Sequence, residues 1–335
     1  MQKQSAIYLV LILLASAAGC VHHSSIWQDP SRHHVQFVTV EEGVRLEVLD
    51  WGGTGRALVL LAGSGCTAHI FDDLAAKLSS NYHVYGVTRR GFGTSSHPDG
   101  GYTDQRRADD VLQVLDSLKI VAPVLAGHSL AGSELTTLAS QHPDRIAGLV
   151  YLEAAADPTL DYADYEKLRK KLPPVFPPRP PQSAEDRLNF QAYQSWQMKA
   201  MGVAFPESEL RNEYTTHADG SLGDFRTSPS IFAAIRAGGK KRDYSRIQAP
   251  VLAFAALPKP LEAQMLQYEV KGAADRAAIK AIYDADIYWA DREMKNLHSR
   301  ADVRVVKLAG ANHYIFLSNE EDVLREMRLF LRGLN

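Results

Sequence analysis

The chain has 335 residues, with 37 Lys and Arg against 39 Asp and Glu, and two cysteines. Its 45% hydrophobic and 23% charged residues are close to the globular average, which excludes wholesale disorder. A formal charge of −2 gives no electrostatic reason to expect nucleic acid as a partner, and two cysteines exclude a disulfide-rich scaffold or a four-thiolate zinc site. The length favours two domains, or one large domain with an insertion.

The first residues are typical of an export signal. Lys3 precedes an uncharged, mostly apolar run from Ala6 to Ala18 that is too short for a permanent membrane helix. The next residues complete the stretch Ala17-Ala18-Gly19-Cys20, which resembles the lipobox of bacterial lipoproteins. The resemblance implies a signal peptide over 1–19, a lipid on Cys20 that attaches the protein to a membrane, and a place at the bacterial cell envelope. The alternative is an ordinary secretory signal and a secreted or periplasmic protein.

Residues 20–34 are polar and predict a tether between this signal and a folded domain. The pairs His22-His23 and His33-His34 lie within it, and histidine pairs can bind metal. Because no cluster of acids or thiolates accompanies them, we interpret both pairs as polar linker residues. The sequence therefore predicts neither a metal nor a cofactor.

A regular alternation of strands and helices begins at Val35. The alternating segments 35–40 and 44–49 predict a β-hairpin, and the apolar run 57–62 predicts a strand buried on both faces. Further strands are expected at 83–88, 123–126 and 146–152, with helices at 71–78, 103–118 and 130–141 between them. This order predicts an α/β fold with a mostly parallel central sheet flanked by helices.

The alternation stops over residues 158–248, which contain no convincing buried strand. Helical spacing recurs there at 184–201, 207–214 and 230–237, beside a proline-rich passage at 173–181. A structureless loop of this length is implausible in a compact domain, so the block predicts an inserted, mainly helical lid. The sheet pattern resumes at 250–255 and 303–308, with helices at 279–297 and 320–331. One domain, 35–157 and 249–335, thus surrounds the lid.

The strand at 123–126 ends in Gly127-His128-Ser129-Leu130-Ala131-Gly132, and a helix follows at once. A serine on such a tight turn is held in a strained conformation that exposes its hydroxyl. The helix N-terminus beside it favours developing negative charge. Small residues are needed around the serine because the turn crowds its neighbours. Ser129 is therefore the candidate nucleophile.

Here the sequence resembles the α/β-hydrolase family, from about Val35 to Leu334. The segment 61–65 matches the family's oxyanion loop, although Ala62 stands where a histidine is usual. The resemblance implies that the backbone N–H groups of Ser64 and Leu130 form the oxyanion hole. Residues 88–95 resemble the turn after the family's fourth strand. His313, in the loop after the last strand, matches the position of the catalytic histidine.

The residues alone leave more than one candidate for the acid that would orient the catalytic histidine. The family often places it after the strand at 250–255, where no carboxylate occurs before Glu262. Some members place it one strand earlier, and that strand ends at Glu153. A carboxylate at the end of a buried apolar strand needs a partner, and a histidine N–H is such a partner. We therefore assign Glu153, with Asp157 and Glu262 as the alternatives.

These residues predict a serine hydrolase that cleaves a small, partly hydrophobic ester through an acyl-enzyme. The lid supplies apolar side chains, some of which are expected to line the pocket over the nucleophile. They are Tyr162, Tyr165, Phe176, Phe190, Tyr193, Trp196, Met198, Met201 and Phe205. A peptidase, lactonase, thioesterase, carbon–carbon hydrolase or haloperoxidase remains open. So does a non-catalytic, membrane-tethered binding protein on the same scaffold. The sequence does not fix the oligomeric state.

Three further side chains near these motifs carry expectations. Cys66, in the oxyanion loop, has no later cysteine to pair with, and we interpret it as a small buried hydrophobe rather than a reactive thiol. His69 is expected to line or flank the pocket. His128 is expected to pack in the interior rather than to act in catalysis.

Overall fold

The computed structural model describes residues 27–155, 181–266, 268, 270–298 and 302–334. The chain separates into two units, residues 1–30 and residues 31–335. Residues 27–30 of the first unit hold no helix or strand, and the predicted signal peptide and Cys20 lie outside the described residues. No helix in the described ranges combines the length and apolar character needed to cross a membrane.

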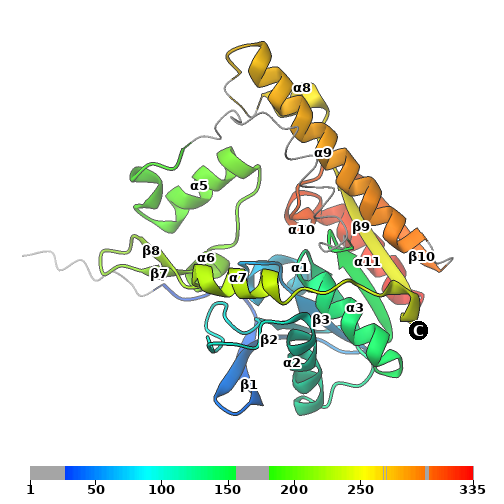
Figure 1. Cartoon of the computed structure of the whole chain (residues 1–335). Coiled ribbons are helices and arrows are strands. Elements are labelled where there is room, and N and C mark those ends of the chain that lie inside the picture. The colour runs from blue at the N-terminus through cyan, green and yellow to red at the C-terminus, as the bar shows by residue number, and fades with distance from the viewer. Residues whose placement is uncertain (1–26, 156–180, 267, 269, 299–301, 335) are drawn as a thin grey trace, which may run out of the picture. The chain divides into compact units, whose positions relative to one another are not determined.

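The centre of the second unit is an eight-stranded sheet in the order β1-β2-β4-β3-β5-β6-β9-β10 (Figure 1). Strands β1 and β2 form the predicted hairpin, β2 also pairs antiparallel with β4, and every other pairing is parallel. The predicted mostly parallel sheet is thereby confirmed. The strands are β1 His34–Glu41, β2 Val44–Gly52, β3 Ala57–Leu61, β4 His83–Val87, β5 Val124–His128, β6 Gly148–Leu152, β9 Val251–Leu257 and β10 Val303–Ala309.

Helices cover both faces of this sheet, because successive side chains of a strand point to opposite faces. Leu58 and Leu60 of β3 belong to one hydrophobic cluster, with α1 (Asp72–Leu78) and α11 (Glu320–Arg332). Val59 and Leu61 of β3 belong to a second cluster, with α2 (Asp104–Ser117) and α3 (Ala131–Gln141). The continuous apolar run of β3 is therefore buried on both sides, as its composition predicts.

The block predicted as a lid contains the expected helices within its described part. They are the α-helices α5 Phe190–Met201, α6 Glu207–Glu213 and α7 Pro229–Ala237. The 3-10 helix η3 Glu185–Arg187 falls within the predicted range 184–201, and the 3-10 helix η4 Tyr244–Arg246 was not predicted. It also contains a hairpin of β7 (Tyr214–Thr216) and β8 (Leu222–Phe225), which the sequence analysis did not predict. These strands have only three and four residues, too few to show a period of two. Residues 173–180 of the proline-rich passage lie outside the described residues.

The remaining elements lie, in chain order, between the strands of the sheet or after its last strand. They are the 3-10 helices η1 Ala68–Phe71 and η2 Pro143–Arg145, and the α-helices α8 Leu261–Met265, α9 Ala273–His298 and α10 Ile315–Ser318. In a parallel sheet the carboxyl ends of all strands meet at one edge, and ligand sites form in the loops there. The loops after β3, β5, β6, β9 and β10 therefore share that edge.

Candidate active site

Ser129 stands on a sharp turn between β5 and α3. Its φ angle is +53°, in the left-handed region that side chains rarely adopt, and its backbone N–H donates to the carbonyl of Leu152 at 3.3 Å. A methyl group added at Gly127 would lie 2.9 Å from the Cβ of Ala131 and 2.7 Å from a methyl of Leu135. The turn therefore requires small residues at both ends of the motif, as the sequence predicts, and it presents the Ser129 side chain above the sheet edge.

His313 and Glu153 come together at the same edge from different loops. Nδ1 of His313, after β10, lies 3.1 Å from Oε2 of Glu153, after β6. The other carboxylate oxygen of Glu153 accepts a 2.6 Å hydrogen bond from the backbone N–H of Ala256 in β9. Glu153 also has a φ of +53°, so its backbone is strained in the same sense as that of Ser129. Both oxygens of this carboxylate are thus held in place.

The two alternative acids are placed differently. Glu262 lies in the first turn of α8 and, within the described residues, makes no hydrogen bond or ion pair with His313. Asp157 lies outside the described residues. Of the described candidates, Glu153 is the one whose carboxylate contacts the histidine.

The loop after β3 approaches the nucleophile through its backbone. A methyl group added at Gly63 would lie 3.3 Å from the Cβ of Ser129 and 2.6 Å from Nδ1 of His128. The absence of a side chain at Gly63 is what permits this approach. The next residue, Ser64, lines the same cavity as Ser129 and Leu130. The two proposed oxyanion positions therefore lie at one opening.

A buried arginine fixes the shape of this loop, and the sequence analysis missed it. The guanidinium of Arg89 donates to the carbonyl oxygens of Ala62 at 2.6 Å and Gly63 at 2.7 Å. It also forms a bidentate ion pair with Glu134 of α3, which Arg107 contacts from the other side at 2.9 Å. Arg89 lies within the turn motif at 88–95, but its partners are far apart in sequence. Because the carbonyl groups of Ala62 and Gly63 point toward Arg89, the orientation of the loop's backbone is fixed.

All five candidate residues line one cavity of about 770 Å³: Ser64, Ser129, Leu130, Glu153 and His313. Its wall also includes polar and charged side chains, among them Arg242, Lys259 and Asn312. The amide of Asn312 donates to the backbone carbonyl of Met201 at 2.6 Å, which joins the histidine loop to the lid block. The cavity is thus of mixed polarity, less apolar than the sequence analysis expected.

Of the apolar lid side chains, some were expected to form a core and others to line this cavity, and the described aromatic ones do not line it. Phe190, Tyr193 and Phe205 are buried, and Trp196 packs against the same core cluster. Met201 is the member of the predicted set that lines the cavity, while the side chain of Met198 is exposed. Large aromatic side chains gain more from burial in the core than from partial exposure at a pocket wall. The remaining members, Tyr162, Tyr165 and Phe176, lie outside the described residues.

Two expectations about single side chains agree with their burial. His128 is 1% exposed, its Nε2–H donates to the backbone carbonyl of His313 at 3.0 Å, and the two rings lie 4.6 Å apart. Burial, with the nearby imidazole of His313, holds the pKa of His128 well below its usual value, so it stays neutral. Cys66 is 1% exposed, and burial raises the pKa of its thiol. It therefore behaves as a buried hydrophobe.

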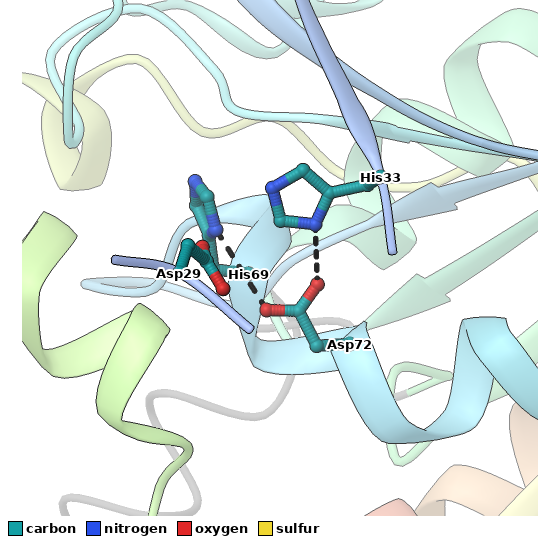
Figure 2. Close-up of side chains that lie close together, drawn as sticks. All are labelled: Asp29, His33, His69 and Asp72. Atoms are coloured by element: carbon teal, nitrogen blue, oxygen red, sulfur yellow. Dashed lines mark hydrogen bonds and ion pairs between the residues drawn. The ribbon is translucent and has the colours of Figure 1, made fainter. Parts of the chain in front are cut away.

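His69, which was expected to line or flank the cavity, does not line it. Its ring is buried between two carboxylates, and its Nε2 lies 3.5 Å from Glu47. Its Nδ1 lies 3.7 Å from Asp72 (Figure 2). Nδ1 of His33 lies 2.8 Å from the same Asp72 carboxylate. The sequence analysis treated His33 as a linker residue because Asp72 and His69 are distant in sequence.

A pair of buried carboxyls, Glu209 and Glu213 of α6, lies beneath the oxyanion loop. Glu209 accepts a 2.8 Å hydrogen bond from the backbone N–H of Thr67 and a short one from its hydroxyl. Burial raises the pKa of Glu209 to about 7 and, with the charge of Glu209, raises that of Glu213 well above its usual value. The lid block is thus joined to the oxyanion loop by groups that carry protons near neutral pH.

With the fold and this geometry in view, comparisons with known proteins decide the family. The model of the alpha/beta hydrolase family matches residues 58–326. The chain belongs to the alpha/beta hydrolase family. Among curated alpha/beta hydrolase relatives, fluoroacetate dehalogenase of Burkholderia sp. is 27% identical over 176 residues, 51% of each chain. 2-(Acetamidomethylene)succinate hydrolase of Mesorhizobium japonicum is 29% identical over 101 residues, 30% of this chain and 36% of that protein.

The match to a non-heme chloroperoxidase of Kitasatospora aureofaciens is 31% over 118 residues, 35% of this chain and 42% of that protein. These matches thus span between about a third and a half of each relative's length. Among solved structures, E-2-(acetamidomethylene)succinate hydrolase superposes with a TM-score of 0.65 at 20% identity, over 90% of this chain and 99% of that one. The esterase RhEst1 from Rhodococcus sp. gives 0.56 at 19% identity, over 90% of this chain and 99% of that one. At these identities the two structures support the alpha/beta hydrolase fold alone.

Proposed function

We propose that this alpha/beta hydrolase is a serine hydrolase that cleaves a small, partly hydrophobic carboxylic ester. Ser129 is the nucleophile, His313 the general base and acid, and Glu153 the residue that orients the imidazole. The observation that carries the proposal is the 3.1 Å contact between His313 and Glu153 at the cavity that Ser129 also lines. Residues from the loops after β5, β6 and β10 converge there, which is the arrangement that activates a serine.

The proposed reaction has two halves. His313 takes the proton of the Ser129 hydroxyl as its oxygen attacks the ester carbonyl, and the resulting oxyanion accepts hydrogen bonds from the backbone N–H groups of Ser64 and Leu130. His313 then protonates the leaving alcohol, and Ser129 retains the acyl group. In the second half, His313 deprotonates a water that attacks this acyl-enzyme, which releases the carboxylic acid and restores Ser129.

Glu153 is suited to the third role by the way it is held. Its Oε2 faces Nδ1 of His313 and its Oε1 is fixed by the Ala256 N–H, so the carboxylate favours the tautomer with a proton on Nδ1. That tautomer leaves Nε2 of His313 available as the base. The strained backbone at Glu153 supports the same role, since such strain often occurs at functional sites.

A fluorophosphonate probe tests the nucleophile directly. Wild type should be labelled and Ser129→Ala should not, while the exposed-serine control Ser80→Ala should be labelled like wild type. Absence of labelling in both wild type and control would contradict the proposal and favour a non-catalytic binding protein. Labelling of Ser129→Ala would place the nucleophile elsewhere.

A substrate panel distinguishes the ester reaction from the others that the fold can host. Chromogenic esters of increasing acyl length should be turned over, with the highest kcat/KM at short to medium length. Lactones, thioesters, amide substrates, and halide with peroxide should be tested beside them. Faster turnover of any of these classes than of the best ester would replace the ester assignment but keep Ser129 as nucleophile.

We propose, from the sequence alone, that the protein is exported and carries a lipid on Cys20. Expression of the full chain in a bacterium with a labelled fatty acid tests this. Wild type should incorporate label and sediment with membranes, whereas Cys20→Ala should do neither. Equal recovery of both proteins in the soluble periplasmic fraction would indicate an ordinary secretory signal instead.

A further inference from the structure

Three metal-ligating side chains converge outside the cavity. His33 immediately precedes β1, His69 belongs to η1, and Asp72 opens α1. Figure 2 shows both imidazoles turned toward the Asp72 carboxylate, with Nδ1 of His33 2.8 Å from Oδ1 and Nδ1 of His69 3.7 Å from Oδ2. The three side chains are only 3%, 4% and 6% exposed. Three potential ligand atoms therefore meet in one buried place.

The negative charge of the carboxylates in this cluster requires a compensating positive charge. Asp72 and Glu47 are both buried, and within the described residues neither forms an ion pair with lysine or arginine. The histidines are the groups that face them. Two buried carboxylates without such a partner must be compensated by protons on the imidazoles or by a bound metal.

The surroundings resemble the outer hydrogen bonds of metal sites. A ligating histidine usually directs its other ring nitrogen at a carboxylate, and Nε2 of His69 faces Glu47 at 3.5 Å. Glu47 is fixed in turn by the hydroxyl of Thr88 at 2.7 Å. Ligating carboxylates are also hydrogen-bonded, and Asp72 accepts from Nε1 of Trp51 at 3.1 Å and from the hydroxyl of Ser208 at 2.5 Å.

We infer that His33, His69 and Asp72 form a binding site for one divalent transition metal ion, with zinc the best match. Two imidazoles and one carboxylate suit zinc better than magnesium or calcium, which prefer oxygen ligands. Tetrahedral zinc ligands at about 2.0–2.1 Å from the ion lie roughly 3.3 Å from one another. Nδ1 of His33 and Nδ1 of His69 lie 2.8 and 3.7 Å from the two different oxygens of Asp72, and one ligand atom from each residue lies within 4.8 Å of the others. Binding of one ion therefore requires side-chain shifts that bring these atoms closer together.

A proton competes with the metal for this site. Although burial lowers it, hydrogen bonds and charge from Asp72 and Glu47 raise the pKa of His69 to about 10, so in metal-free protein the imidazole carries the compensating charge. A metal ion that binds Nδ1 displaces this proton, as metal binding to histidine generally does. The same carboxylates that favour the proton favour the ion.

The site has a structural role, because none of its three ligands lines the catalytic cavity. It would join the start of β1 to η1 and α1, and through Ser208 it reaches α6 of the lid block. Metal binding therefore stabilises the fold without taking part in ester cleavage. The inference is independent of the proposed catalytic function.

Zinc binding by the full chain tests the inference. Protein treated with a chelator and then dialysed should bind one equivalent of Zn²⁺ by calorimetry and elemental analysis, and its Tm should rise. His33→Ala should lower the affinity at least tenfold. Two controls, His142→Ala and the double variant His22→Ala with His23→Ala, should bind like wild type. Failure of wild type to bind zinc, or wild-type affinity in His33→Ala, would overturn the inference.

A gain of signal keeps the test valid if the alanine variant folds poorly. In His33→Cys, Co²⁺ should produce a thiolate-to-cobalt charge-transfer band in the near ultraviolet, and Zn²⁺ should remove it by displacement. A band that wild type shows with Co²⁺ would come from Cys20 or Cys66, so only the band of His33→Cys in excess of wild type counts. If folded His33→Cys, checked by circular dichroism, gives no band at saturating Co²⁺, His33 is not a ligand and the inference is wrong.

Discussion

The guanidinium of Arg89 donates to the backbone carbonyl of Gly63 at 2.7 Å, from a side chain that is itself paired with Glu134. This contact ties the loop before Ser64 to the first turn of α3, the helix that follows Ser129. The two halves of the proposed oxyanion hole are therefore held by one buried ion pair. Arginine is needed because its planar fork reaches two carbonyls and a carboxylate at once.

Replacement of Arg89 should consequently impair turnover more than binding. Arg89→Lys keeps the charge but loses the fork, so kcat should fall by roughly tenfold to a hundredfold, the typical result of a displaced catalytic group. KM should change less than threefold. The surface control Arg145→Lys should behave like wild type. Steady-state kinetics on one chromogenic ester measures kcat and KM for each variant. An unchanged kcat in Arg89→Lys would show that Arg89 does not support catalysis.

Gly63 provides a steric test of the same loop. A methyl group there would lie 2.6 Å from Nδ1 of His128, so Gly63→Ala must displace the loop or the imidazole. We expect kcat to fall at least tenfold and the free energy of unfolding to drop by about 1–3 kcal/mol. Gly100→Ala is the matched control, because nothing lies within 4 Å of the added group. Equal effects of the two substitutions in denaturant melts and kinetics would contradict the close approach.

Glu153→Gln tests the triad acid. The amide keeps the shape of the side chain but no longer favours the tautomer that leaves Nε2 of His313 unprotonated. The loss of kcat should reach about 10²–10⁴-fold, near the effect of the equivalent change in serine proteases. Glu262→Gln should retain wild-type turnover. The reverse pattern would assign the acid to Glu262, and full activity in both variants would point to another carboxyl, with Asp157 the next to replace.

The proton-bearing pair on α6 predicts how stability depends on pH. The folded-state pKa of Glu209, about 7, and that of Glu213 lie above the ordinary glutamate value of about 4.5, so above about pH 4.5 these two carboxyls bind more protons in the folded protein than in the unfolded chain. Stability is therefore lost as the pH rises through about 7, by up to about 1.4 kcal/mol per pH unit for each group.

Urea unfolding of wild type and Glu213→Gln between pH 5 and pH 8 measures this effect. The neutral amide cannot ionise, so the plot of unfolding free energy against pH should be flatter for the variant. Proton uptake at other groups, such as His69, contributes to both plots and therefore cancels in their difference. Glu207→Gln on the same helix should follow wild type. Parallel curves for Glu213→Gln and wild type would show that the carboxyl pair does not titrate in this range.

The sequence predicts a structural feature well when the residues that form it are close together in the chain, and poorly when they are far apart. Ser129 and the strand before it are specified by a short local pattern, and most strands and helices were predicted within a few residues. The roles of Arg89, Glu209 and His33 depend on partners 26 to 142 positions away, which only the folded chain brings together. The β7–β8 hairpin was not predicted because its strands are too short to show a period of two. The sequence also does not indicate which aromatic side chains of the predicted lid pack in the core and which line the cavity.

The charge of the cavity wall leads to a prediction about substrate preference. Lys259 lines the cavity and, among the described residues, forms no ion pair. A carboxylate on the acyl chain should therefore be attracted, by an amount typical of an exposed ion pair, about 1 kcal/mol or roughly fivefold in kcat/KM.

The butyrate and hemisuccinate esters of p-nitrophenol form a matched pair for this comparison. In Lys259→Met the ratio of hemisuccinate to butyrate kcat/KM should fall about fivefold, and Lys259→Glu should lower it further. The Lys199→Met control should keep the wild-type ratio, and added salt should weaken the preference of wild type only. A ratio that is the same in wild type and Lys259→Glu would mean that the charged part of such substrates does not approach Lys259.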